Sequence, residues 1–255
     1  MDASKNSPRL IYAANRQLGL NGLELLIERN WKPIGLLLPK GKVSKCADEM
    51  QQLLPNVPVL WGKEFKSIEG IQKLSELEPD YILSIHFPYM FPAEILKIPK
   101  IGVLNLHPAF LPFNRGWHSA SWTILEDTPF GVTLHWVDEE LDSGDIFLQK
   151  QIEVHPDDTA NTLYRRALTL EKCLLGDAIR LLLKGELSHV PQSGNSTFHK
   201  KGDLISRQEL CLEEKMKVKE VLKQLRALTT DRLQEAAYYE VNGVRYRVKI
   251  EIVKE

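Results

Sequence analysis

The first hundred residues alternate short apolar runs with helix-like segments, and this order constrains the fold more than any other feature. The apolar runs lie at Leu10–Ala14, Ile34–Leu38, Val57–Leu60, Tyr81–Ile85 and Ile101–Leu106. Because they are apolar throughout, we expect strands buried on both faces, as in a parallel sheet covered by helices. Residues 8–107 therefore predict an open, doubly wound α/β unit with a mostly parallel sheet.

Helical patterns fill the gaps between these runs, and strands and a long helix follow them. The intervening helices are expected at Gly22–Glu28, Val43–Leu54, Ile68–Leu77 and Pro92–Leu96. Two further strands, Phe130–Val137 and Asp145–Val154, are joined by the acidic loop Asp138–Gly144, whose residues favour turns. A long helix is expected at Ala160–Lys184, with Thr159 as its N-cap and Gly185 at its end.

The last quarter of the chain differs in pattern from the rest. Residues 192–202 are polar and rich in turn formers, which indicates a boundary. A helix at Glu213–Leu228 follows, then a hairpin whose Asn242-Gly243 pair predicts a type I′ turn. We therefore expect a large domain at residues 1–190 and a small C-terminal appendage of helix plus β-hairpin at residues 191–255.

Charge and composition exclude several classes of protein. The formal net charge of −1 provides no long-range attraction for nucleic acid. The polar start of the chain and the lack of a run of about eighteen apolar residues predict a cytoplasmic protein that has no membrane partner. The three cysteines lack paired spacing, and the histidines lack metal-site spacing, so we expect free, buried thiols and no metal.

Asn105, His107 and Asp142 are the residues best suited to chemistry. Asn105 and His107 lie two apart in an extended run, so their side chains leave the same face where the strand ends. Ligands bind beyond the carboxyl ends of strands in such sheets, and the acidic loop could return Asp142 toward His107. An amide, an imidazole and a carboxylate together can stabilise an oxyanion and move a proton.

An Asn-x-His sequence after a strand is, by itself, more often a satisfied turn than a reactive pair. The long Pro-containing apolar loop after His107 favours the functional interpretation, because loops of this kind shape pockets. His135, by contrast, is interpreted as a strand residue with a local partner.

Several spaced motifs carry a family resemblance. They are Asn105-Leu106-His107-Pro108, Leu111-Pro112, Arg115-Gly116, Gly131-Val132-Thr133-Leu134-His135, and Leu141-Asp142-Ser143-Gly144-Asp145-Ile146 with Gln149. In this order they resemble the N10-formyltetrahydrofolate-dependent formyltransferase family, over about residues 81–187. The resemblance implies a Rossmann-like formyltransferase core and a folate co-substrate.

The resemblance also implies roles for particular residues. Asn105, His107 and Asp142 would form a catalytic triad, with the acceptor amine attacking the formyl carbon directly. The pterin would lie between the segment after Tyr81–Ile85 and the acidic loop. The residues expected to contact the folate there are Ser84, Phe87, Tyr89, Met90 and Asp138.

Differences between this chain and individual branches of the family limit which acceptor molecule it is expected to use. The segment from Ala13 to Gly19 lacks the glycine-rich phosphate loop of the glycinamide ribonucleotide enzymes. Methionyl-tRNA formyltransferases carry a longer C-terminal barrel and more basic charge. The chain is most similar to the branch that formylates nucleotide-linked amino sugars. Enzymes of this branch act, for example, in lipopolysaccharide O-antigen biosynthesis. The resemblance also implies a homodimer. The expected sugar-nucleotide contacts are Asn114, Arg115, Gly116, Trp117 and His118.

Two alternatives stay open at this point: a methionyl-tRNA formyltransferase, and a non-catalytic relative that binds folate or a nucleotide. The sequence does not specify the sugar, the position of its amine, the nucleotide or the dimer interface.

Overall fold

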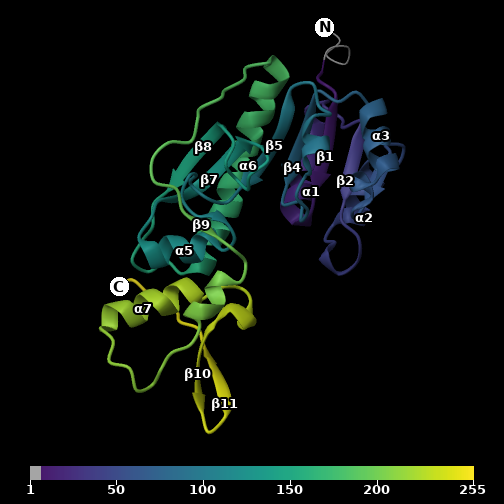
Figure 1. Ribbon diagram of the computed structural model, residues 1–255. Helices are drawn as coiled ribbons and strands as arrows, with labels where there is room; N and C mark the ends of the chain where they lie inside the picture. Colours follow the sequence, from purple (N-terminus) through teal and green to yellow (C-terminus); the bar gives the residue numbers. More distant parts are fainter. Residues whose placement is uncertain (1–6) are drawn as a thin grey trace. The chain divides into compact units, whose positions relative to one another are not determined.

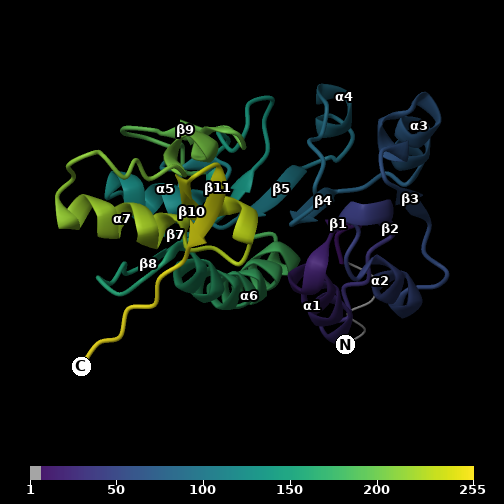
Figure 2. The ribbon, with the colours of Figure 1, turned by 90° about the horizontal axis from the view of Figure 1, so that it is seen from below.

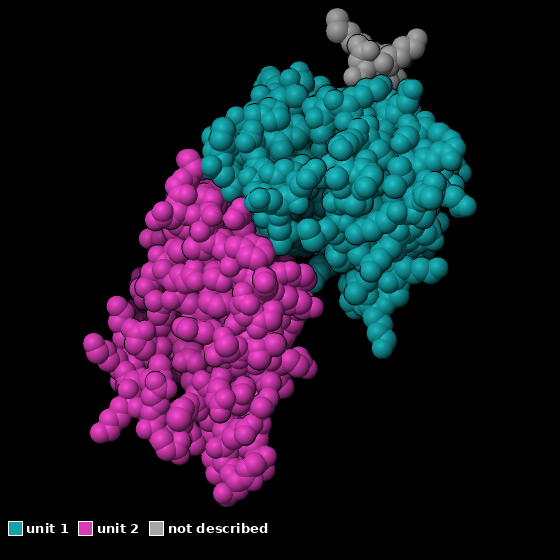
Figure 3. Space-filling view, viewed as in Figure 1, with its two compact units in different colours: residues 1–107, 133–148, 171–192 teal, residues 108–132, 149–170, 193–255 magenta. Residues whose placement is uncertain are grey.

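The structure, a computed structural model, describes residues 7–255. The chain forms two compact units, which Figure 3 shows in different colours. Unit 1 contains the residues up to His107 together with 133–148 and 171–192, and unit 2 contains 108–132, 149–170 and 193–255. Whether residues 1–190 and 191–255 behave as separate domains stays a prediction.

A seven-stranded sheet in the order β3-β2-β1-β4-β5-β7-β8 is the main framework (Figure 1). Its strands are β1 (Leu10–Ala14), β2 (Gly35–Leu38), β3 (Val59–Trp61), β4 (Tyr81–Ile85), β5 (Gly102–His107), β7 (Phe130–Trp136) and β8 (Ile146–Ile152). The pairs from β3 through β5 are parallel, whereas β7 runs antiparallel to β5. The predicted mostly parallel sheet is confirmed.

Helices cover both faces of this sheet (Figure 2). In unit 1 these include α1 (Arg16–Glu28), α2 (Ala47–Leu53), α3 (Ile68–Glu76) and α4 (Ala93–Leu96), and the long helix α6 (Ala160–Lys184) continues from unit 2 into unit 1. The helices α5 (Ser119–Glu126) and α7 (Val218–Leu228) belong to unit 2. Ile11 of β1 belongs to the core cluster that includes Leu74 of α3 and Ile95 of α4. Its neighbour Tyr12 points the other way and donates a hydrogen bond to the Gly19 carbonyl of α1 at 2.8 Å. Successive residues thus face opposite helical layers, which confirms the doubly wound arrangement.

The C-terminal part of unit 2 contains α7 and a hairpin of β10 (Ala237–Val241) and β11 (Val244–Val248). The φ angles of Asn242 and Gly243 are 51° and 75°, the positive values that a type I′ turn requires. The expected appendage of helix plus hairpin is therefore confirmed. Two short strands, β6 (Arg115–Gly116) and β9 (Phe198–His199), also pair in parallel within unit 2.

Some boundaries differ from the sequence-based expectations. Helix α7 begins at Val218 rather than Glu213, because residues 213–217 are all exposed and, apart from Met216, charged, so they supply no buried apolar face to stabilise a helical turn. Helix α1 begins earlier than expected, at Arg16. The long helix α6 begins and ends as expected, and Thr159 accepts a 3.3 Å hydrogen bond from the Thr162 amide.

Four short 3-10 helices complete the described elements: η2 (Gly41–Val43), η3 (Glu64–Lys66), η4 (Asp203–Arg207) and η5 (Leu233–Glu235). In the part of the chain that the structure describes, no helix combines the length and the apolar character of a membrane span.

Candidate active site

The carboxyl ends of β4 and β5 define the site in unit 1. These strands pair in parallel, with Ser84 beside Asn105 and Ile85 beside Leu106. Their next residues, His86 and His107, therefore lie at neighbouring strand ends. On the other side of β5 the antiparallel register sets Asn105 opposite His135 of β7.

The acidic loop between β7 and β8 brings a carboxylate into unit 1. Gln192 donates hydrogen bonds to the carbonyls of Asp142 and Gly144, at 3.0 and 2.8 Å. A Cβ atom on Gly144 would lie 2.1 Å from the Trp136 carbonyl oxygen, so only glycine fits this close approach. Asp142 has a φ of 54°, a left-handed conformation that Asp and Asn adopt more readily than most residues. The loop thus leaves the Asp142 side chain only 7% exposed.

The structure brings the three predicted residues together. The Nε2 atom of His107 lies 3.7 Å from Oδ2 of Asp142, and the Nε2 atom of His135 lies 3.5 Å from Oδ1. The Nδ2 atom of Asn105 lies 3.3 Å from Nε2 of His135. One buried carboxylate therefore faces two imidazoles, and the amide of Asn105 contacts one of them.

His135 is the member of this group that sequence reasoning missed. Its Nδ1 atom lies 2.8 Å from the Trp136 carbonyl oxygen, which can only accept, so Nδ1 carries a hydrogen. In the neutral ring Nε2 then holds a lone pair and accepts a hydrogen bond from the amide nitrogen of Asn105. The expected local partner is thus confirmed. The motif Gly131-Val132-Thr133-Leu134-His135 contained the signal that could have assigned this residue to the site.

Burial controls the electrostatics of His107. Removal from water lowers the pKa of His107 below its ordinary value, while Asp142 acts in the opposite direction. Smaller effects come from His135 and His86, which lower this pKa, and from Glu171, which raises it. Among the described residues, His107 is one whose buried ring nitrogen, Nε2, makes no hydrogen bond. A neutral imidazole whose ring nitrogen makes no hydrogen bond can accept a proton from a ligand.

The residues expected to contact a folate lie near the end of β4 and in the acidic loop. Ser84 is buried within β4, and Asp138 is exposed and accepts a 2.6 Å hydrogen bond from the Ser143 hydroxyl. Phe87 and Tyr89 pack together with a ring-centroid distance of 5.2 Å, and the neighbouring Met90 is exposed. Their contact with a folate stays a prediction.

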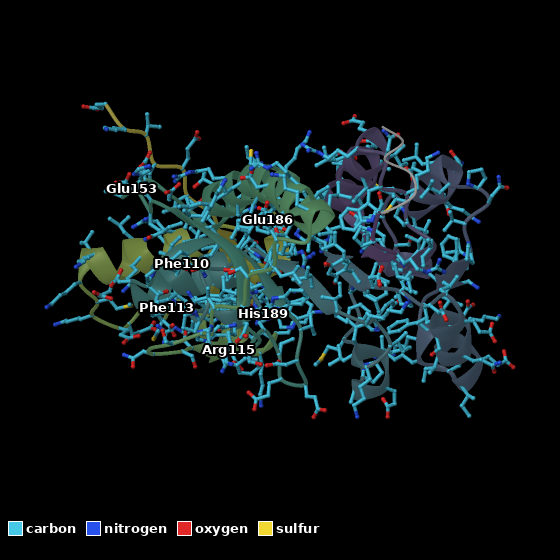
Figure 4. All side chains as sticks on the ribbon, turned by 90° about the horizontal axis from the view of Figure 1, so that it is seen from above. Phe110, Phe113, Arg115, Glu153, Glu186 and His189 are labelled. Carbon is cyan, nitrogen blue, oxygen red and sulfur yellow. The ribbon has the colours of Figure 1, made fainter. Side chains whose placement is uncertain are left out.

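Unit 2 holds the residues that were expected to contact the sugar nucleotide. Arg115, labelled in Figure 4, and Gly116 form β6, and Trp117 is 44% exposed with the Lys201 ammonium 5.0 Å from its ring centroid. His118 precedes α5 in a left-handed conformation, and burial lowers its pKa.

Asn114 differs from these neighbours because its side chain is buried and fully bonded within the loop. Its Nδ2 atom donates to the hydroxyls of Thr123 and Thr128, and its Oδ1 atom accepts from the hydroxyl of Thr197. The amide therefore shapes the loop. Substrate contact for the five residues from Asn114 to His118 stays a prediction.

In the described part of the chain, no three His, Cys, Asp or Glu side chains gather in a way that could hold a metal ion. The carboxylate of Asp142 instead faces His107 and His135. The cysteines are free, but the expectation that they are buried is wrong, because Cys46 is partly exposed and Cys173 and Cys211 are exposed.

Comparison with known protein families identifies the family of the fold that contains Asn105, His107, His135 and Asp142. A family model described as "Formyl transferase" matches residues 42–179, more than half of the chain. The chain belongs to this formyl transferase family. A second model, "N-formyltransferase dimerization C-terminal domain", matches residues 203–254, where α7 and the hairpin lie.

The curated relatives match this chain over only part of their own length. A methionyl-tRNA formyltransferase from Thermodesulfovibrio yellowstonii is 30% identical over 75% of this chain and 65% of its own length. The chain spans less than two thirds of the first curated relatives it matches, and as little as 31% of one of them.

Two solved structures of similar fold cover nearly all of the chain. A 4-N formyltransferase from Francisella tularensis has a TM-score of 0.82 at 21% identity, covering 97% of this chain and 99% of that one. An N-formyltransferase from Helicobacter canadensis, solved with folinic acid and dTDP-3-aminofucose, has a TM-score of 0.69 at 19% identity, covering 92% and 85%. At these identities the likeness shows the fold.

Proposed function

We propose that this formyl transferase moves a formyl group from N10-formyltetrahydrofolate to the primary amine of a nucleotide-linked deoxyamino sugar. The observation that carries the proposal is the group of Asn105, His107 and the buried Asp142 at the carboxyl edge of the sheet. We further propose that the enzyme is cytoplasmic and acts as a homodimer, as the matched C-terminal family description suggests.

The folate supplies the formyl group and a nitrogen, N10, that leaves with a proton. The acceptor amine forms the new C–N bond, and the bond from the formyl carbon to N10 breaks, without a covalent enzyme intermediate. His107 takes the amine proton through Nε2, which makes no hydrogen bond, because its lowered pKa keeps the ring neutral near pH 7. His107 then gives this proton to N10 as the bond from N10 to the formyl carbon breaks. Asp142 stabilises the positive charge that His107 then carries.

Asn105 is the oxyanion donor in this proposal. His135 fixes the orientation of the amide, since its lone pair accepts from Nδ2. The second Nδ2 hydrogen can then be donated to the formyl oxygen as negative charge develops there. A donor that is positioned before the reaction is worth about 3 to 4 kcal/mol of transition-state stabilisation.

The residues around the end of β4 are suitable for a pterin. Phe87 and Tyr89, whose rings meet edge to face, offer aromatic surface that suits an aromatic ring system. The Helicobacter canadensis relative, which binds folinic acid and a nucleotide-linked amino sugar in its structure, supports the same ligand classes for this chain.

Two features support an amino sugar as the acceptor. Asn15, after β1, uses its side chain to bond the backbone of Val43 and Lys45, so it is not free to bind the phosphate of a ribonucleotide substrate. In unit 2, the exposed ring of Trp117 beside Lys201 suits a nucleotide, because it combines a stacking surface with a positive charge.

Turnover assays test the proposal directly. The purified chain would be incubated with N10-formyltetrahydrofolate and a panel of dTDP- and UDP-linked 3-amino and 4-amino sugars. Release of tetrahydrofolate would be followed by absorbance, and the formamide by mass spectrometry, with His107→Asn as the inactive control. Turnover of at least one sugar is expected.

Formylation of methionyl-tRNA is the second candidate, because several curated relatives carry that name. Turnover of charged tRNA without turnover of any amino sugar would replace the proposed function by this one. A folate complex with no turnover of either acceptor would identify a non-catalytic binding protein.

A further inference from the structure

A second imidazole–carboxylate pair lies in unit 1 besides the one that the proposed mechanism uses. The Nε2 atom of His86 lies 3.1 Å from Oε1 of Glu171, on α6. The Glu171 side chain is 0% exposed and that of His86 is 9% exposed. Among the described residues, Glu171 is one whose buried second oxygen, Oε2, has no hydrogen-bond partner. A buried carboxylate with an unpaired oxygen reduces stability, so packing alone does not explain this pair.

The pair belongs to the same strand ends as His107. Ile85 and Leu106 are the last residues that pair between β4 and β5, and His86 and His107 follow them directly. His86 has a φ of 53°, a conformation that few non-glycine residues adopt and that often marks a functional site. Both members of the pair also act on the pKa of His107, Glu171 raising it and His86 lowering it.

The reaction needs more than one proton acceptor. Primary amines have pKa values of about 8 to 10, so near pH 7 most of the acceptor is an ammonium ion. The ammonium must lose one proton to free its lone pair and a second one when the amide forms. Only the second proton can leave with the folate nitrogen. His107 moves that second proton, so the first one needs another base.

We propose that His86, held by Glu171, accepts the first proton from the ammonium form of the substrate. This inference rests on the proposed function. His86 keeps its Nε2 hydrogen on Glu171, and the lone pair of Nδ1 takes the proton, so that an ammonium and a neutral imidazole become a free amine and an imidazolium. No carbon bond changes in this step. The partly exposed ring then returns the proton to water.

Glu171 acts through His86 and is a positioning residue. Its carboxylate fixes the tautomer of His86 and stabilises the imidazolium that forms. The charges of Asp142, His135, Glu171 and His86 all act on the pKa of His107, so replacing any of them can change the pH profile of the enzyme through His107.

The test is the pH dependence of kcat/KM for His86→Asn and Glu171→Gln on the amino sugar that the wild type formylates. Asn is chosen because it tolerates the left-handed backbone at this position. Near pH 7, His86→Asn should lower kcat/KM by about 100-fold. The defect should shrink to about threefold near pH 9.5, where the substrate amine is already neutral. Glu171→Gln should show a smaller defect with the same trend.

A substrate analogue gives a second, independent measurement. An acceptor with fluorine next to the amine is neutral near pH 7, since electron withdrawal lowers the amine pKa. This analogue should restore His86→Asn to nearly the wild-type rate at that pH. Thermal unfolding shows whether His86→Asn folds. If it does not, the pH dependence of kcat/KM and the rate with the fluorinated acceptor are measured on Glu171→Gln instead.

The matched control is His189→Asn. His189, labelled in Figure 4, belongs to unit 1, has a side chain that is more than half exposed, and lies 3.7 Å from Asp145. His189→Asn should keep wild-type kinetics at every pH. A defect in the His86 and Glu171 variants that is independent of pH and unaffected by the fluorinated acceptor would overturn the inference and leave the proposed function standing. A wild type that formylates no amino sugar would overturn both.

Discussion

His107 and Asp142 face each other across 3.7 Å, which is within ion-pair range but longer than a hydrogen bond. Asp142 therefore acts on His107 in this structure through its charge. Replacing Asp142 with Asn removes the charge, keeps the volume, and suits the left-handed backbone. We expect kcat to fall about 100-fold or more with an unchanged unfolding temperature. The exposed Asp145→Asn is the control, and equal kinetics for both variants would remove Asp142 from the mechanism.

Asn105→Ala should reduce kcat by about 100- to 1000-fold, because it deletes the donor for the developing oxyanion. The KM for the amino sugar should change little, since the lost interaction strengthens only in the transition state. Steady-state kinetics with both substrates varied would separate the two parameters. A raised KM with unchanged kcat would instead make Asn105 a binding residue.

Gly144→Ala should disturb the acidic loop, because the added methyl group would meet the Trp136 carbonyl oxygen. We expect a loss of about 1 to 3 kcal/mol of unfolding free energy in urea titrations, together with a lower kcat. Gly202→Ala is the matched control, since nothing lies within 4 Å of its Cβ position. Equal stability of the two variants would show that the loop accommodates the methyl group.

The lowered pKa of His107 makes a prediction about stability. The unfolded chain binds a proton at this residue near pH 6.5, whereas the folded chain resists it, so the stabilisation is present above that pH and lost as the pH falls. His118 has a pKa lowered in the same direction and contributes with the same sign. Between about pH 7 and pH 5, the wild type should lose more unfolding free energy than His107→Asn. Parallel slopes in urea titrations at these pH values would contradict the assignment.

The sequence predicted the elements whose signals are local. Continuous apolar runs located β1, β4 and β5, and the Thr159 and Gly185 signals located both ends of α6. Helix α5 escaped prediction because its residues are buried almost throughout, which leaves no alternation of apolar and polar positions. The two-residue strands β6 and β9 depend on a pairing across more than eighty residues, for which no local pattern exists.

The sequence also predicted those parts of the site that depend on local spacing. Asn105 and His107 share a strand, so their proximity follows from spacing alone. The inclusion of His135 depends on the register between β5 and β7, which only the folded sheet defines. The pair of His86 and Glu171 joins residues 85 positions apart, one after a strand and one on a helix. Burial, which lowers the pKa of His107, is likewise a property of the assembled unit.

The antiparallel pairing of β5 with β7 has an evolutionary consequence. Asn105 and His135 are held opposite each other by backbone hydrogen bonds of the sheet, whatever the length of the chain that connects the two strands. Residues 108–132, which carry the expected acceptor contacts, form most of that connection. Insertions, deletions or replacement of this segment leave Asn105 and His135 in register. Related enzymes can therefore change their acceptor by changing this segment while keeping the same catalytic residues.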